Sequence, residues 1–174
     1  FIFIVLLLFL GLYCSLVIGI SWDEPLSNSY SLAKIKFIKT LGINLEYLKY
    51  HSSHNPGFYT TILAFVSNLF SSHFVFEIRH LINFIISCLT LYGLYLVIRD
   101  NFDKKLALLT VLLCLLNPFF FGLMSITVRD LPVCFAYVWT IYFFSKYIQN
   151  FFEKRIKYAA LLGLAIGFGM GARV

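Results

Sequence analysis

The chain has 174 residues, of which 60% are hydrophobic and only 13% are charged, and its mean hydropathy is +0.86. Because about a quarter of the residues in soluble domains are charged, this composition excludes an ordinary soluble protein and indicates a membrane protein. The net charge of +6 does not indicate a nucleic-acid-binding protein. The basic residues are scattered between apolar runs and form no basic face with interleaved aromatic residues.

Five apolar segments are long enough to be membrane-spanning helices, which need about 20 mostly apolar residues. A signal peptide is the alternative interpretation of the first segment. The segments are 1–22, 80–98, 106–128, 131–152 and 158–174. We therefore predict an all-α fold, a polytopic transmembrane helical bundle with about five spans in one domain over 1–174. Both ends lie inside apolar runs, so we expect the chain to be the N-terminal part of a longer protein.

The segment 56–76 is ambiguous, because it carries no formal charge but has several hydroxyl and amide side chains. If it does not span and the N-terminus is cytoplasmic, the loops 99–105 and 146–157 both face the cytoplasm. These two loops hold half of the 14 lysines and arginines, as the positive-inside rule favours. We therefore predict a long outer loop over 23–79. Its segment 26–41 mixes apolar residues with lysines, which is typical of a basic interfacial helix.

In this topology, ionisable residues gather near the outer membrane face, where such residues are functional candidates. They are Asp23, Glu24, His51, His54, Arg79, Arg129, Asp130 and Arg173. Structural roles are the alternatives. An acid of the first pair would cap a helix that begins at Pro25, and Asp130 would cap the helix that carries Pro132. The two arginines 79 and 129 would be interface anchors.

The only metal hypothesis is a divalent ion held by His51 and His54 with Asp130, and the alternative is that "HSSHNPG" is a polar loop. The four cysteines lie inside apolar runs without a metal-ligand spacing. Buried thiols of this kind behave as small hydrophobic side chains, so we predict neither a disulfide framework nor any other cofactor.

The order of these features resembles the N-terminal part of the GT-C glycosyltransferases. The closest group is the protein O-mannosyltransferase family (family 39), with the related bacterial aminoarabinose and lipid-A sugar transferases. The resemblance begins with the acid pair Asp23-Glu24 after the first span and the proline-containing segment "HNPGFYTTILAF". It continues through two spans within "RHLINFIISCLTLYGLYLVIRDNFDKKLALLTVLLCLLNPFFF". Asp130 then opens the fourth span in "SITVRDLPVCFAYV", and the glycine-rich "LLGLAIGFGMGARV" ends near Arg173.

The resemblance implies an integral-membrane hexosyl- or pentosyltransferase. Such enzymes move a sugar from a polyprenyl-phosphate-linked donor to a hydroxyl of a protein, lipid or glycan on the periplasmic or lumenal face. The membrane would be a bacterial inner membrane or the endoplasmic reticulum. A transporter or flippase of a lipid-linked sugar and a non-catalytic membrane subunit are the competing functions.

The resemblance also implies a role for each candidate residue. Asp23 would be the base of an inverting single displacement, and Glu24 would orient it or bind substrate. Arg173, Arg129 or Arg79 would stabilise the charge that develops on the lipid phosphate as it leaves. Asp130 would hold a metal, a sugar hydroxyl or one of the arginines.

Overall fold

The computed structural model describes residues 2–50, 56–126, 129–149 and 155–173. The described residues form helices and no strand, which confirms the predicted all-α fold. In chain order the helices are α1 (Ile2–Val17), α2 (Glu24–Lys39), η1 (Glu46–Lys49), α3 (Phe58–Ser67), η3 (Ser72–Phe74), α4 (Val75–Asn101), α5 (Lys104–Leu116), α6 (Pro118–Leu123), α7 (Asp130–Gln149) and α8 (Arg155–Ala172).

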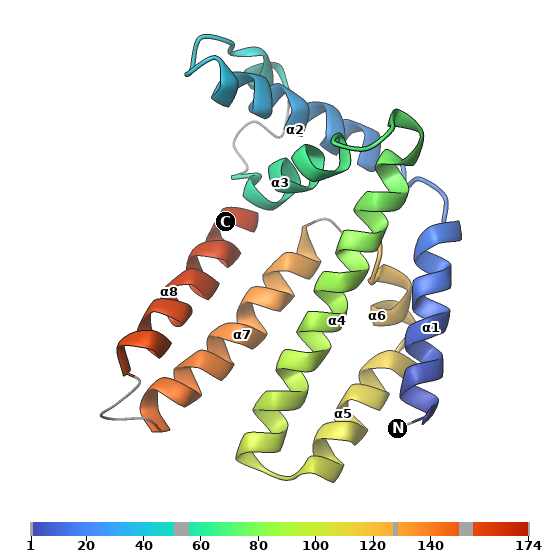
Figure 1. The fold of residues 1–174 in the computed structure, drawn as a ribbon, viewed down its shortest axis with the longest axis vertical. Helices are drawn as coiled ribbons and strands as arrows, with labels where there is room; N and C mark the ends of the chain where they lie inside the picture. Colours follow the sequence, from blue (N-terminus) through green and yellow to red (C-terminus); the bar gives the residue numbers. More distant parts are fainter. Residues whose placement is uncertain (1, 51–55, 127–128, 150–154, 174) are drawn as a thin grey trace.

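The long helices run side by side as a bundle, and α2 and α3 lie across one of its ends (Figure 1). Helix α4 is central, with α7 and then α8 on one side and α1 and α5 on the other. Two stretches of the described chain, 72–101 and 130–149, are long and apolar enough to cross a membrane. The fold is thus a helical membrane bundle, and the assignment of five individual spans stays a prediction.

Apolar packing joins the helices in two places. Phe84 and Leu91 of α4 pack with Val111 and Leu115 of α5 and with Met124, which follows α6. A second cluster of Tyr59, Leu63 and Ala172 joins α3 to the end of α8. This second cluster holds the short helix α3 against the end of the bundle.

The segment 56–76 does not form one long helix. Its main element, α3, has 10 residues and is therefore about 15 Å long, whereas the hydrocarbon core of a bilayer is about 30 Å thick. A helix of this length does not cross a membrane. The helix predicted within 26–41 is present as α2, and its position in the membrane interface stays a prediction.

The predicted span 106–128 is broken into two helices at Asn117-Pro118. The side chain of Asn117 accepts hydrogen bonds from the backbone N–H groups of Phe119 and Phe120, at 3.0 and 3.2 Å. Proline has no N–H to continue the first helix but fits the first turn of the next one. The asparagine thus ends α5 and caps α6, and this pair of short helices takes the place of a single continuous one.

The glycine-rich helix α8 packs closely on α7. A Cβ atom built on Gly169 would lie 2.8 Å from the Cβ of Ala136, which is closer than two carbon atoms approach. Small residues at such crossings let helix backbones come together in lipid. The contact positions the end of α8, and therefore Arg173, beside the start of α7.

Candidate functional site

The two adjacent acids that follow α1 have opposite environments. Asp23 is exposed, and its Oδ1 accepts a hydrogen bond from the Ser21 hydroxyl at 2.8 Å. Glu24 is fully buried, and its two oxygens accept from the Ser21 backbone N–H at 2.7 Å and from His80 Nε2 at 2.8 Å. Although Asp23 occupies the N-cap position of α2, its side chain makes no capping hydrogen bond.

Arg79 lies beside this pair and is also fully buried. Its Nη1 donates to the side-chain oxygen of Asn28 at 3.1 Å, which links α4 to α2. The carboxylate of Glu24 lies within electrostatic reach of the guanidinium. The Nε and Nη2 groups of Arg79 are buried without a partner among the described residues. A buried charge is tolerated only when nearby groups compensate it, and here Asn28 and the carboxylate of Glu24 do so for Arg79. The start of α2 is therefore held by charge as well as by packing.

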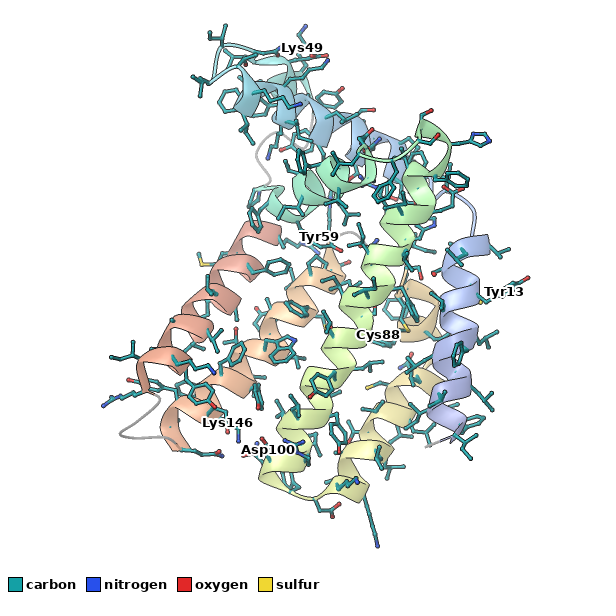
Figure 2. The ribbon with its side chains drawn as sticks, in the orientation of Figure 1. Tyr13, Lys49, Tyr59, Cys88, Asp100 and Lys146 are labelled. Carbon is teal, nitrogen blue, oxygen red and sulfur yellow. The ribbon has the colours of Figure 1, made fainter. Side chains whose placement is uncertain are left out.

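A chain of buried hydrogen bonds continues below α3. The hydroxyl of Tyr59 donates to Asn83 Oδ1 at 2.6 Å, and Asn83 Nδ2 donates to the backbone oxygen of Ser125 at 2.8 Å. One turn further along α4, the Ser87 hydroxyl donates to the backbone oxygen of Met124 at 2.8 Å. Burial raises the pKa of Tyr59, which keeps its phenol a neutral donor. These bonds fix α3, α4 and the turn after α6 to one another (Figure 2 labels Tyr59).

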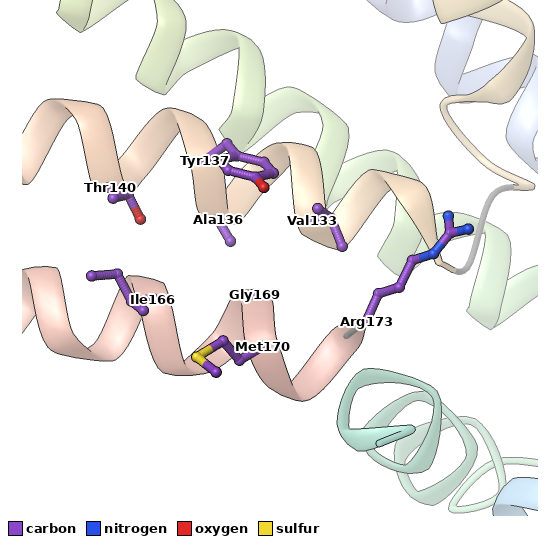
Figure 3. A pocket seen from close by; sticks show the side chains of 8 residues that line it. All are labelled: Val133, Ala136, Tyr137, Thr140, Ile166, Gly169, Met170 and Arg173. Atoms are coloured by element: carbon purple, nitrogen blue, oxygen red, sulfur yellow. The ribbon is translucent and has the colours of Figure 1, made fainter. Parts of the chain in front are cut away.

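The remaining predicted residues lie where α7 begins and α8 ends. Arg173 Nη1 donates to Asp130 Oδ1 in an exposed ion pair, and Figure 3 shows the arginine reaching from the end of α8 toward the start of α7. A pocket of about 220 Å³ lies between these helices beside the arginine, and Val133, Tyr137 and Met170 are among its lining residues.

Arg129 is exposed and forms no ion pair with a described residue. Burial and the neighbouring Tyr47 raise the pKa of Tyr30 on α2, and the charge of Arg129 opposes that rise. Arg129 therefore lies within electrostatic reach of α2. Of the three predicted arginines, Arg129 is the one that is exposed and forms no ion pair with a described residue, because Arg79 is buried and Arg173 pairs with Asp130.

All the described candidates lie at one end of the bundle, but in two groups. Glu24 and Arg79 come together where α2 begins beside α4, whereas Asp130 and Arg173 pair where α7 begins and α8 ends. No hydrogen bond or ion pair between described residues joins Asp23 to the second group. The hypothesis of a metal at His51 and His54 falls outside the described residues. Within the described ranges, no three histidine, cysteine or acidic side chains form a metal-ligand group.

Three buried polar residues of the site were not among the predicted ones: His80, Asn83 and Tyr59. The sequence contained a signal for His80 and Asn83, because polar residues recur at helical spacing through the apolar run of α4. His80, Asn83, Ser87 and Thr90 are all buried on one side of that helix. Such a polar stripe in a predicted span indicates a face that packs against polar partners rather than lipid.

Residues 54–174, more than two thirds of the chain, match the model of the dolichyl-phosphate-mannose-protein mannosyltransferase family. The chain belongs to this family. Membership confirms the resemblance to GT-C glycosyltransferases and establishes a membrane glycosyltransferase of the mannosyltransferase type. The region that matches this mannosyltransferase family contains Arg79, Arg129, Asp130 and Arg173, whereas Asp23 and Glu24 precede it. No curated protein and no solved structure matches the chain.

Proposed function

We propose that this protein transfers a sugar from a polyprenyl-phosphate-linked donor to a hydroxyl group of a protein, on the periplasmic or lumenal face of its membrane. Membership of the mannosyltransferase family supports a lipid-linked donor and a protein acceptor. In this proposal α1, α4, the α5–α6 pair, α7 and α8 cross the membrane, and α2 and α3 lie at its outer interface.

The distribution of charge along the bundle supports this orientation. The end opposite the candidate site carries Arg99 and Lys146, both paired with Asp100 at 2.7 and 2.8 Å (Figure 2 labels Asp100 and Lys146). Four more basic residues lie in the first turns of α5 and α8 at that same end: Lys104, Lys105, Arg155 and Lys157. Because short cytoplasmic loops are rich in basic residues, this end is cytoplasmic, and the acids of the candidate site face outward.

The contrast between Asp23 and Glu24 is the observation that carries the proposal. A general base must reach the proton that it removes, and the exposed carboxylate of Asp23 is open to an acceptor hydroxyl. The buried carboxylate of Glu24 is occupied by His80 and the Ser21 N–H, so it cannot approach a substrate. Asp23 is therefore the base, and Glu24 is the residue that fixes the turn that presents it.

In the reaction, Asp23 accepts the proton of the acceptor hydroxyl while the oxygen forms a bond to the anomeric carbon of the sugar. The bond between that carbon and the phosphate oxygen breaks, and the lipid phosphate leaves from the opposite face, so the configuration inverts. Arginine stabilises the phosphate as its charge develops. Arg129 is the candidate for this role because it is exposed and forms no ion pair with a described residue, whereas Arg173 beside it pairs with Asp130.

The test is the substitution Asp23→Asn in the full-length protein, assayed with a polyprenyl-phosphate sugar and normalised to folded protein. Loss of the base should lower turnover by roughly a hundredfold to ten-thousandfold. Asp103→Asn is the matched control. Asp103 is an exposed aspartate at the N-terminus of α5, at the opposite end of the bundle, and asparagine can still cap that helix. Turnover of Asp23→Asn within threefold of the control would overturn the assignment.

A further inference from the structure

An apolar groove runs between α2 and α3, outside the candidate site. It has a volume of about 470 Å³ and is walled by Ile35 and Ile38 of α2 and by Phe58, Ile62 and Phe65 of α3. Much of this apolar surface is open, since Ile38 is 61% exposed and Phe65 is 51% exposed. Because most of the residues that line the groove are apolar, it suits a flexible hydrocarbon chain.

Two lysines of α2, Lys34 and Lys39, line the same groove. Lys34 is already engaged: its Nζ donates to the backbone oxygen of Pro56 at 2.7 Å and lies over the ring of Tyr30. Lys39 is exposed in the last turn of α2 and has no acidic partner among the described residues. The neighbouring Lys36 pairs with Glu46 at 3.3 Å, so that acid does not neutralise Lys39.

The backbone at the start of α3 keeps the groove in shape. Gly57 has a φ of +65°, in the left-handed region that glycine adopts without strain. A side chain there would lie 2.9 Å from the Lys34 ammonium group, so glycine also makes room for the bond from Lys34 to Pro56. This bond joins α2 to α3 and holds the two walls at a fixed separation.

We propose that the groove between α2 and α3 binds an acyl chain of an anionic phospholipid whose phosphate pairs with Lys39. The two helices lie across the end of a membrane bundle (Figure 1). In the orientation proposed above, this end lies at the outer interface, where lipid head groups meet acyl chains. An apolar channel with a cation at its edge complements a ligand that has a hydrocarbon tail and a negative head group. The lipid would anchor α2 and α3 to the membrane surface, which is a role separate from the sugar transfer proposed above.

The experiment is native mass spectrometry of the full-length protein in neutral detergent, titrated with phosphatidylglycerol or with phosphatidylcholine of the same acyl chains. Wild-type protein should retain phosphatidylglycerol in preference to phosphatidylcholine. Ile62→Trp fills the groove and should abolish this retention. Leu69→Trp is the matched control, because Leu69 is an exposed apolar residue that does not line the groove.

The charge is tested separately with Lys39→Gln and its control Lys49→Gln, an exposed lysine outside the groove. One lysine near a membrane surface accounts for about a fivefold change in affinity for an anionic lipid, so Lys39→Gln should weaken phosphatidylglycerol binding by about that factor. This change affects only an exposed side chain, so it decides the question even if Ile62→Trp does not fold.

Three results would each overturn the proposal. The first is equal retention of the two phospholipids by the wild-type protein. The second is unchanged phosphatidylglycerol affinity in Lys39→Gln. The third is one-for-one displacement of phosphatidylglycerol by polyprenyl phosphate, because the groove would then be a donor site.

Discussion

The substitution His80→Leu tests whether the buried pair of Glu24 and His80 holds α2 on the bundle. The two side chains are almost completely buried, and the bond between them joins residues 56 positions apart in the chain. Leucine removes the donor without opening a large cavity. The substitution therefore leaves the Glu24 carboxylate buried with one oxygen unpaired.

Removing the hydrogen-bond partner of a buried carboxylate leaves its charge poorly compensated, which costs about 3–5 kcal/mol. Two contacts of Glu24 survive here, because Ser21 still donates to its second oxygen and Arg79 stays within electrostatic reach. We therefore expect the low end of that range, about 3 kcal/mol. In a chain of 174 residues 1 kcal/mol corresponds to about 2–4 °C, so the apparent Tm should fall by about 6–12 °C, and by less in a longer full-length protein.

The assay is thermal unfolding of the full-length protein in detergent, followed by a dye that becomes fluorescent on exposed thiols. Cys88 and Cys114 are partly buried free thiols in the bundle and report its opening. His73→Leu is the matched control, because His73 is exposed and an exposed substitution changes stability by about 0.5 kcal/mol or less. A double variant in which Glu24→Met accompanies His80→Leu should show a coupling energy of about 1–3 kcal/mol. An equal Tm in His80→Leu and His73→Leu would refute the inference that the pair of Glu24 and His80 holds α2 on the bundle.

Two further predictions concern the bundle. Gly169→Leu should force α8 away from α7 and lower the apparent Tm by several degrees. Gly167→Leu should not, because no atom lies within 4 Å of a Cβ built there. Similar melting of the two variants would show that the close helix contact is not required. A single cysteine at Ser29 should react with an impermeant thiol reagent from outside, and one at Asn101 only after permeabilisation. External labelling at Asn101 would contradict the proposed orientation.

The helical class, the membrane environment and most of the helices could be read from the sequence, because each depends on local composition. An apolar run of sufficient length predicts a buried or spanning helix wherever it occurs. Proline at 118 and the asparagine before it are a local signal for an interruption of the span 106–128, and the structure breaks the helix there. The clustering of charged residues in two loops likewise predicted which helix ends lie together.

The tertiary structure decided which of two neighbouring acids is accessible. Asp23 and Glu24 have similar chemistry and adjacent positions, so no local pattern separates them. The difference arises because α4 presents His80 and Arg79 to Glu24 from more than 50 residues away. In the same way, a sequence shows that Asn83 is a polar residue in an apolar run, but only packing brings Tyr59 and the Ser125 carbonyl within hydrogen-bond distance of it. A buried polar group is stable only with such partners, and distant segments supply them once the chain has folded.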